Sequence, residues 1–248
     1  MRIRNKAAVV TGGASGLGAA CVEMLRAEGA HVAVVDLAGG NGRPGDLVFP
    51  VDVADPVALD EAIRAVADSF GRVDIAIACA GVAPPRRILG KDGPMPLDEF
   101  ARVVNVNLTG AFNLARLAAA KMAVNDPDES GERGVIVMTS SIAAFEGQIG
   151  QCAYAASKAG VAGLTLPMAR DLARHAIRVM TIAPGIFDTP LLAGLPEEAR
   201  ASLAAGVPCP ARLGQPAEFA ALARHIIENP YLNGEVIRLD AALRMGPK

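Results

Sequence analysis

The chain has 248 residues, of which 52% are hydrophobic and only 4% aromatic, and its formal net charge is −2. A core built from Ala, Val, Leu and Ile suits a parallel β-sheet covered by helices. A nearly neutral chain without a long basic block is not expected to bind nucleic acid or an anionic membrane surface.

The cysteines and histidines give no sign of a disulfide framework or a metal site. The four cysteines are spread along the chain and form no C-x-x-C pair, which is typical of reduced thiols in an intracellular protein. The three histidines form no metal-like cluster, so we predict no metal. No apolar run is long enough for a signal segment or a membrane span. We expect a cytoplasmic protein, and the mitochondrial matrix stays open as an alternative.

The first strongly informative stretch is a glycine-rich turn. Residues 6–11 (KAAVVT) predict a buried strand that runs directly into TGGASGLG, and an amphipathic helix (19–27) follows. Glycines between a strand and a helix let the backbone approach a pyrophosphate, whose charge the helix N-terminus stabilises. We therefore predict a dinucleotide site in which the important glycines are Gly12, Gly16 and Gly18.

Asp36 ends the next predicted strand (31–36), at a position where a carboxylate can accept hydrogen bonds from both ribose hydroxyls of adenosine. A 2′-phosphate at the same place would meet a like charge. We therefore predict NAD rather than NADP, with Arg43 as the only nearby cation that argues otherwise. The alternative is that Asp36 is only a turn residue.

The rest of the chain continues the alternation of strands and helices. Strands are predicted at 47–51, 73–78, 135–139, 177–182 and 234–239. Helices are predicted at 97–121 and 216–228, together with one that starts at 55 and one that carries Tyr154 and continues through 172. Asp52 follows one strand and is placed to meet the adenine edge. Another strand ends in the small residues Cys79, Ala80 and Gly81. This pattern predicts an α/β fold: one Rossmann-type, doubly wound parallel sheet flanked by helices, spanning residues 1–248 as a single domain.

Within that domain we expect a dinucleotide-binding half at about 1–140 and a catalytic and substrate half at about 141–248. Residues 83–96 read as a surface loop whose Arg86, Arg87 and Lys91 could hold phosphates of a large substrate; a solvated loop is the alternative. Residues 191–207 could form a mobile flap over an apolar substrate or an ordinary packing helix. The apolar end, 240–245, suggests a subunit contact.

Tyr154 and Lys158 stand four residues apart on a predicted helix, and Ser140 and Ser141 end the preceding strand. This spacing stacks the two helical side chains on one face, with a strand-end hydroxyl opposite. A phenol has a pKa near 10 and is a poor base at neutral pH. A nearby ammonium and the positive nicotinamide ring would both favour the phenolate. The arrangement suits removal of a proton from an alcohol, although the spacing alone is also common in surface pairs.

Together these residues resemble the short-chain dehydrogenase/reductase family over essentially the whole chain. The resemblance is carried by the glycine-rich turn, Asn107, Ser141, Tyr154-(x)3-Lys158 and Pro184-Gly185. It implies that Tyr154 is the general acid/base, that Ser141 hydrogen-bonds the reacting oxygen, and that Lys158 holds the nicotinamide ribose and lowers the pKa of the tyrosine. It also implies that Asn107 anchors a water in the proton path.

The cofactor-binding residues predicted from the turn and from the resemblance come from most of the strand ends. They are Gly12, Ser15, Gly16, Leu17, Gly18, Asp36, Asp52, Val53, Cys79, Ala80, Gly81, Tyr154, Lys158, Pro184, Gly185, Phe187 and Thr189.

Within the family, the stretches SSIAAFEGQIGQCAYAASKAG, IRVMTIAPGIFDTPLL and ENPYLNGEVIRLDAALRM are similar to a group of 3-hydroxyacyl-CoA dehydrogenases that also act on hydroxysteroids. This resemblance implies a homotetramer that interconverts a 3-hydroxyacyl-CoA and a 3-oxoacyl-CoA with NAD. Alternatives are a hydroxysteroid or other secondary-alcohol dehydrogenase, or a 3-oxoacyl-acyl-carrier-protein reductase. In another class, the chain could be a non-catalytic dinucleotide-sensing or scaffold protein, which an intact Ser-Tyr-Lys set disfavours.

Two positions depart from the family pattern. The usual N-N-A-G stretch reads Ala78-Cys79-Ala80-Gly81, so hydrogen bonds made by those asparagines are lost. Ala241 stands where relatives usually have glycine, which could alter packing at a subunit interface.

Overall fold

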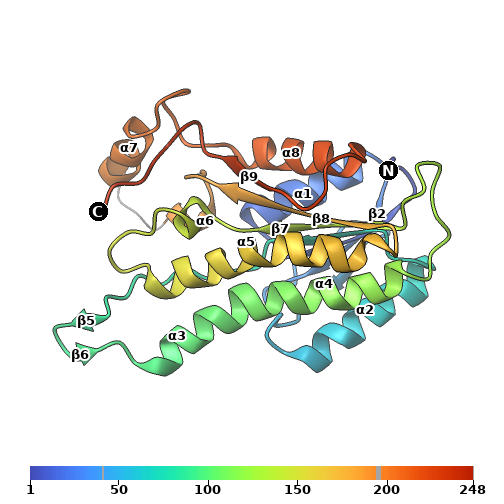
Figure 1. Cartoon of the computed structure of the whole chain (residues 1–248), viewed down its shortest axis with the longest axis horizontal. Helices are drawn as coiled ribbons and strands as arrows, with labels where there is room; N and C mark the ends of the chain where they lie inside the picture. Colours follow the sequence, from blue (N-terminus) through green and yellow to red (C-terminus); the bar gives the residue numbers. More distant parts are fainter. Residues whose placement is uncertain (41, 194–196, 248) are drawn as a thin grey trace.

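A seven-stranded parallel sheet forms the centre of the protein, seen here in a computed structural model that describes residues 1–40, 42–193 and 197–247 (Figure 1). Its strand order is β3-β2-β1-β4-β7-β8-β9. In chain order the strands are β1 (Ala7–Thr11), β2 (His31–Val35), β3 (Leu47–Phe49), β4 (Ile75–Ala78), β7 (Gly134–Thr139), β8 (Ile177–Pro184) and β9 (Val236–Leu239). The predicted single Rossmann-type sheet is confirmed.

The strand order reverses beside β1. The chain runs outward from β1 to β2 and β3, then returns to the other side of β1 with β4. Thr11, the last residue of β1, pairs with Val35 of β2 and Ala78 of β4, so all three strands end at the same edge. Ligands of open α/β sheets bind outside the carboxyl ends of the strands at such a reversal.

Helices cover both faces of the sheet (Figure 1). On one face α1 (Gly16–Ala27) and α8 (Pro216–Glu228) pack against the strands, and α2 (Pro56–Phe70), α4 (Gly110–Met122) and α5 (Cys152–Ala173) cover the other. Side chains alternate along each strand: Ala8 and Val10 face α1 and α8, while Val9 faces the opposite layer. With both faces buried, all five residues of β1 are inaccessible to solvent, which explains its unbroken apolar run.

Local sequence signals set the helix ends. The carboxylate of Asp55 accepts hydrogen bonds from the N–H groups of Val57 (2.9 Å) and Ala58 (3.1 Å), and so caps α2. Pro56 occupies the first turn, where its missing N–H costs nothing, and Gly71 ends the helix with φ +75°. α2 therefore begins where the Asp-Pro pair predicts.

Two segments differ from the sequence prediction. The predicted loop at 83–96 contains a small antiparallel hairpin, β5 (Leu89–Gly90) and β6 (Gly93–Pro94), which projects from the body of the protein (Figure 1). The predicted helix at 97–121 is α3 (Leu97–Val104) and α4 joined by a π-helical turn, η1 (Asn105–Thr109). Such turns are common at functional sites, and asparagine forms regular helix poorly.

The remaining short elements follow β7 and β8. A 3-10 turn, η2 (Ile142–Ala144), follows β7, and the predicted flap region contains α6 (Pro190–Ala193) and α7 (Glu197–Ala205). Residues 194–196 of that region lie outside the described residues, so the flap stays a prediction.

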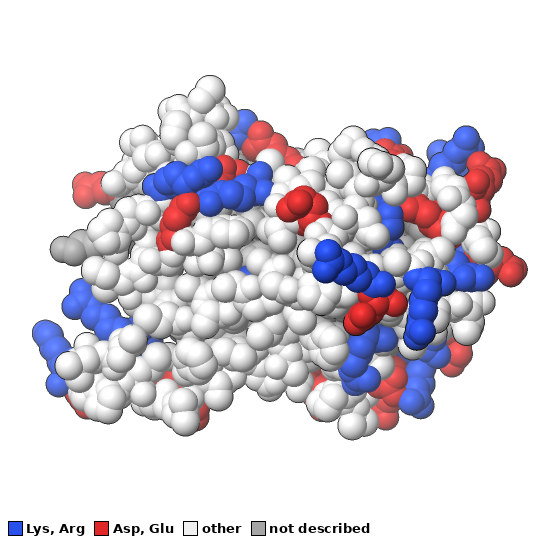
Figure 2. All heavy atoms as spheres, viewed as in Figure 1, with Lys and Arg blue, Asp and Glu red and all other residues white. Residues whose placement is uncertain are grey.

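One face of the surface carries few charges. Figure 2 shows mainly uncharged atoms over α4 and α5, in the same view as Figure 1. A shallow groove of about 300 Å³ lies between these helices, and Phe112 beside it is 42% exposed. Within the described ranges, no helix is long and apolar enough to cross a membrane, and no three His, Cys, Asp or Glu side chains are placed to hold a metal ion.

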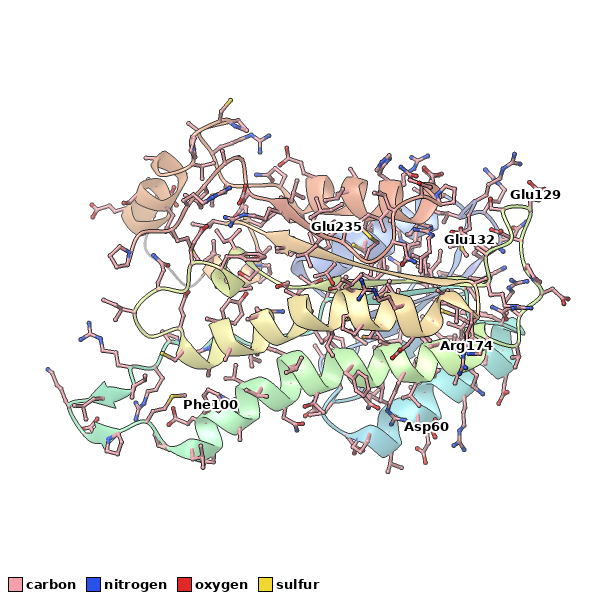
Figure 3. All side chains as sticks on the ribbon, in the orientation of Figure 1. Asp60, Phe100, Glu129, Glu132, Arg174 and Glu235 are labelled. Carbon is pink, nitrogen blue, oxygen red and sulfur yellow. The ribbon has the colours of Figure 1, made fainter. Side chains whose placement is uncertain are left out.

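A buried ion cluster lies at the amino edge of the sheet, away from the strand reversal (Figure 3). Glu132 accepts hydrogen bonds from the N-terminal ammonium of Met1 (2.7 Å) and from the guanidinium of Arg178. Arg178 also donates to the main-chain oxygens of Ile226 (2.8 Å) and Ile227 (2.9 Å). The carboxylate thus pairs with two cations, whose remaining donors are taken by main-chain oxygens, and the bonds from Arg178 fasten α8 to the sheet.

Candidate active site

The glycine-rich turn lies against the end of β4. Gly12 has φ +67°, and its N–H donates to the oxygen of Val35 at 2.9 Å. A Cβ on Gly12 would lie 2.6 Å from the main-chain nitrogen of Ala80, and one on Gly18 would lie 2.1 Å from the oxygen of Gly12. Both positions therefore require glycine, and the backbone is left bare where a pyrophosphate would approach.

The first turn of α1 is open toward that backbone. Ser15 is its exposed N-cap residue and, within the described chain, makes no side-chain capping hydrogen bond. Gly16 has φ +53° and faces Thr189, whose Cβ would be 3.5 Å from an added Cβ. The glycine-rich turn and the segment after β8 thus lie side by side, and both contain residues predicted to bind the cofactor. Leu17 packs partly into the core beside α8.

Asp36 directly follows β2 and holds the glycine-rich turn. Its carboxylate accepts one hydrogen bond from the N–H of Ala14 (3.1 Å) and another from the N–H of Ala38 (3.0 Å). Each carboxylate oxygen has a second lone pair, so the group can still accept from ribose hydroxyls. The predicted ribose ligand therefore lies directly beside the predicted pyrophosphate site.

Four further predicted cofactor residues surround the ends of β3 and β4. Asp52 is exposed and accepts from the N–H of Ala54 at 2.9 Å, while Val53 is buried against Gly110. Cys79 is half-buried, with its Sγ 3.5 Å from Oγ1 of Thr139. An added Cβ on Gly81 would lie 3.1 Å from Oδ1 of Asn107 and 3.6 Å from Nζ of Lys158. Gly81 therefore lies close to both Asn107 of η1 and Lys158 of α5.

The predicted residues after β8 divide into two kinds. Pro184 ends the strand, and Gly185 passes Asp240 so closely that an added Cβ would lie 2.9 Å from its Cα. The Phe187 ring is buried against Phe219, with centroids 6.4 Å apart. Its side chain thus belongs to the core, so the predicted cofactor contact of Phe187 would have to come from its main chain.

The predicted catalytic side chains come from the end of β7 and from α5. Ser141 follows the end of β7, and its Oγ accepts a hydrogen bond from the N–H of Ala143 at 3.1 Å. Lys158 is 5% exposed, donates from Nζ to the oxygen of Thr139 at 2.8 Å, and has Nζ 5.8 Å from the centre of the Tyr154 ring. The ammonium therefore lies beneath the phenol, as the four-residue spacing predicts.

The ionisation of this pair is governed mainly by burial. Burial raises the pKa of Tyr154 above its ordinary value, and the interaction with the Ser141 hydroxyl opposes that rise. Burial also lowers the pKa of Lys158 to about 8, against an opposing effect of Cys79. In the protein alone, burial of the phenol is the larger effect, so the pKa of Tyr154 is raised, whereas the sequence predicted a lowering by Lys158.

Asn107 lies in the π-helical turn and reaches across to two other elements. Its Oδ1 accepts from the N–H of Val82 (2.8 Å), and its Nδ2 donates to the oxygen of Val82 (2.9 Å) and to Oγ of Ser157 (3.0 Å). Both amide protons are used within the protein. Asn107 thus fixes the segment after β4 to α5, and only the second lone pair of Oδ1 is left for a water.

Sequence reasoning missed an ion-pair cluster that supports the loop between Ser141 and Tyr154. Glu146 in this loop accepts two hydrogen bonds from Arg238 of β9, at 2.8 and 3.0 Å. Arg238 also donates to Asp240 at 2.7 Å, and its guanidinium lies 5.2 Å from the centre of the Phe145 ring. The available signal was an arginine inside an otherwise apolar strand, which calls for a buried acidic partner.

Comparison with known proteins agrees with this geometry. Residues 6–200 match the family described as short chain dehydrogenase. The chain belongs to the short-chain dehydrogenase family. The human protein named 3-hydroxyacyl-CoA dehydrogenase type-2 is 52% identical over 99% of this chain and 97% of its own length, and the Drosophila melanogaster protein of that name is 50% identical over 99% and 100%.

A solved structure leads to the same family. The crystal structure of a 3-hydroxyacyl-CoA dehydrogenase type-2 from Mycobacterium avium superposes with a TM-score of 0.92, at 44% identity and over 98% of each chain. This short-chain dehydrogenase is therefore an oxidoreductase that uses a nicotinamide dinucleotide. The bare backbone at Gly12 and the carboxylate of Asp36 fit the pyrophosphate and a ribose of such a cofactor.

Proposed function

We propose that this dehydrogenase oxidises a 3-hydroxyacyl-CoA to the 3-oxoacyl-CoA, reversibly and with NAD. The observation that carries the proposal is the identity of 52% to the human 3-hydroxyacyl-CoA dehydrogenase type-2, which extends over 99% of this chain. The similarity includes the whole catalytic half, where substrates are distinguished.

The chain's own side chains account for the proton transfer. Tyr154 would remove the proton from the 3-hydroxyl, and the Ser141 hydroxyl would hold the same oxygen from the strand side. The bound oxidised nicotinamide supplies the hydride acceptor and a positive charge. Lys158 supports the main chain of Thr139 and would hold the nicotinamide ribose. A second positive charge beside the phenol favours the phenolate, which opposes the effect of burial on Tyr154.

The preference for NAD over NADP rests on Asp36. Its carboxylate lies just after the end of β2, where the adenosine ribose would lie, and it would repel a 2′-phosphate. Arg43, the cation that argues otherwise, has its guanidinium 2.6 Å from a carboxylate oxygen of Glu23. That pairing reduces the positive charge available to a 2′-phosphate.

We also propose a homotetramer. The groove between α4 and α5 is lined partly by apolar side chains, and Phe112 and Leu166 on these helices are 42% and 45% exposed. Exposed apolar patches of this kind mark protein interfaces. Light scattering after size-exclusion chromatography should give four times the mass of 25.4 kDa, and a monomer would contradict the proposal.

The activity is tested by following nicotinamide reduction with 3-hydroxybutyryl-CoA, in parallel with NAD and NADP and with a 17β-hydroxysteroid. Turnover of the thioester with NAD supports both the substrate and the cofactor. Turnover of the steroid or a simple alcohol alone overturns the acyl-CoA assignment and leaves the catalytic residues in place. A clear preference for NADP overturns the role of Asp36.

A further inference from the structure

Two of the four cysteines lie where α1 packs against the end of β4. Cys21 is on α1 and is completely buried. Side chains alternate along a strand, so Cys79 follows Ile75 and Ile77 on the face of the sheet that α1 covers. There it packs against the same apolar cluster that contains Cys21. The fold thus brings together two thiols that are far apart in the sequence, and both are free.

Each thiol of this pair changes the ionisation of the other. The hydrogen bond with Cys79, together with burial, raises the pKa of the Cys21 thiol well above its ordinary value. The pKa of Cys79 is lowered by the hydrogen bond with Cys21. Thr139 and Lys158 lower it further, against the effect of burial. Cys79 is therefore the thiol of the pair that ionises first.

Cys79 also borders two parts of the predicted active site. Its Sγ lies 3.5 Å from Oγ1 of Thr139, whose main-chain oxygen accepts from Nζ of Lys158 at 2.8 Å. An added Cβ on Gly12 would lie 2.8 Å from the carbonyl carbon of Cys79, so the two main chains pass close to each other. A displacement of Cys79 would therefore disturb the glycine-rich turn and the support of Lys158 together.

The two thiols differ in their access to solvent. Cys79 is half-buried at the edge of the sheet where the cofactor would lie, whereas Cys21 is fully enclosed. Reactive cysteines are partly exposed thiols beside a cation. A redox-sensing cysteine often has a second cysteine beside it, which resolves the oxidised form. Cys79 has the first set of properties, and Cys21 is placed to be the resolving thiol.

We propose that hydrogen peroxide oxidises Cys79 and Cys21 to a disulfide, reversibly, and that this disulfide weakens binding of the nicotinamide dinucleotide. The Cys79 thiolate attacks one peroxide oxygen and becomes a sulfenic acid, while the other oxygen leaves as hydroxide. The sulfur of Cys21 then attacks the sulfur of Cys79, and the sulfenic oxygen leaves as water. Two thiols and one peroxide thus give one disulfide and two waters. A dithiol reverses the oxidation by thiol–disulfide exchange.

The disulfide acts on the cofactor site through Cys79. Bond formation draws the Cys79 sulfur toward α1 and away from Thr139. The main chain of Cys79 moves with it, and this main chain lies against Gly12 of the glycine-rich turn. A bound cofactor in turn covers this part of the site, so NADH should slow the oxidation.

The experiment follows the two thiols and NADH binding in the purified enzyme. After treatment with hydrogen peroxide, digestion with trypsin should give peptides 7–26 and 73–86 joined, with the mass of two hydrogens lost. Titration of NADH fluorescence should show binding weakened about tenfold, which corresponds to about 1.4 kcal/mol. Dithiothreitol should restore both thiols and the binding. NADH added before the peroxide should reduce the yield of the joined peptides.

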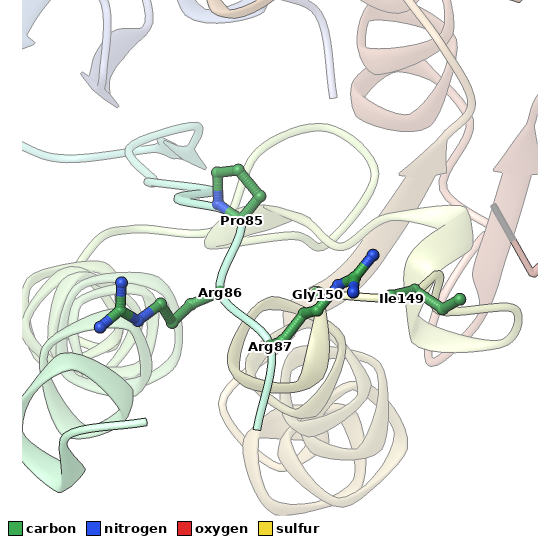
Figure 4. A pocket seen from close by; sticks show the side chains of 5 residues that line it. All are labelled: Pro85, Arg86, Arg87, Ile149 and Gly150. Carbon is green, nitrogen blue, oxygen red and sulfur yellow. The ribbon is translucent and has the colours of Figure 1, made fainter. Parts of the chain in front are cut away.

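Two variants separate this pair from other thiol chemistry. Cys21→Ala leaves the cofactor site intact and should bind NADH like the wild type before treatment. After peroxide, its Cys79 has no resolving partner and is oxidised past the sulfenic acid, so dithiothreitol should not restore NADH binding. Cys152→Ala removes an exposed thiol two residues after Gly150, which lines the hollow shown in Figure 4. This variant should behave like the wild type throughout.

Several results overturn the inference. Treated enzyme in which Cys21 and Cys79 both stay free does so, and so does a disulfide that leaves NADH affinity unchanged. An equal yield of the joined peptides with NADH present also does so. Recovery of Cys21→Ala by dithiothreitol to the wild-type extent would remove Cys21 from the reaction. These readouts do not depend on which alcohol the enzyme oxidises, so they stand apart from the acyl-CoA proposal.

Discussion

Asn107 holds both main-chain polar groups of Val82, accepting from its N–H at 2.8 Å and donating to its oxygen at 2.9 Å. The same amide group donates to Ser157, whose hydroxyl donates to the main-chain oxygen of Tyr154 at 2.7 Å. A continuous hydrogen-bonded path thus joins the segment after β4 to the helix that carries Tyr154. Asn107 acts as a positioning residue in this arrangement.

Asn107→Ala should therefore lower both stability and turnover. Loss of the side chain leaves the N–H and oxygen of the half-buried Val82 without their protein partner. A fully buried unsatisfied group costs about 1–3 kcal/mol, and partial exposure to water makes the loss here smaller. Thermal unfolding and steady-state kinetics measure the two effects. Asn113→Ala is a matched control: Asn113 is buried on the adjoining helix, but within the described chain its Oδ1 has no hydrogen-bond partner. Equal losses in the two variants would contradict a positioning role.

Tyr154→Phe should reduce kcat by about a hundred- to ten-thousandfold, the usual contribution of a general acid/base. The ring stays in place above Lys158, so the fold and cofactor binding should be retained. Stopped assays of turnover and a fluorescence titration with NADH measure the two quantities. A variant that keeps wild-type turnover would remove Tyr154 from the mechanism.

The pH dependence of alcohol oxidation should report the pKa of Tyr154. A base acts in its deprotonated form, so kcat/KM falls about tenfold per pH unit below that pKa. The Ser141 hydroxyl lowers the pKa of Tyr154, so Ser141→Ala should move the rising part of the profile to higher pH. Ser140→Ala is the control, because the Ser140 hydroxyl donates to the oxygen of Lys158 instead. The idea fails if both variants shift the profile equally.

Gly12→Ala should destabilise the protein and weaken NADH binding together. The left-handed φ of +67° costs an alanine about 1–2 kcal/mol, and the new methyl group would meet the backbone of Ala80. Gly45→Ala carries only the first cost, since Gly45 has φ +95° and nothing within 4 Å of an added Cβ. Differential scanning fluorimetry without NADH measures the loss of stability, and the added stabilisation with NADH measures the loss of cofactor binding. If Gly12→Ala loses no more thermal stability than Gly45→Ala, the glycine-rich turn tolerates a side chain.

Asp36→Ser should increase the use of NADP relative to NAD, because it removes the charge that repels a 2′-phosphate. It should also lower the affinity for both cofactors, since the N–H groups of Ala14 and Ala38 lose their carboxylate partner. The ratio of kcat/KM values for the two cofactors measures the first effect. An unchanged ratio would place cofactor selection elsewhere.

The sheet and the cofactor turn were predictable because their signals are local. A strand buried on both faces is mostly apolar, and β1 shows this in the four consecutive apolar residues that precede Thr11. Only glycine fits at Gly12 and Gly18, so the turn is visible in the sequence. The spacing of Tyr154 and Lys158 likewise fixes their common helix face without knowledge of the rest of the fold.

The features that were not predicted depend on distant or very small interactions. The strands of the β5–β6 hairpin have two residues each, too few for an alternating pattern. The π-helical turn at Asn105–Thr109 differs from an α-helix by a single hydrogen-bond shift, which periodicity does not show. Glu146 and Arg238 are 92 residues apart in sequence. Ala241 has φ +49°, a conformation that glycine would adopt at lower cost.

The pairing of Glu146 with Arg238 also bears on how the enzyme is made. The loop between Ser141 and Tyr154 has its main charged anchor in Arg238 of β9, 92 residues after Glu146, and Met245 adds a further hydrogen bond to Glu146 at 3.3 Å. Domains begin to fold during synthesis from their N-terminal part. In a nascent chain this loop is therefore secured only after residues 238–245 have emerged. The segment that separates Ser141 from Tyr154 thus takes its final position late in folding.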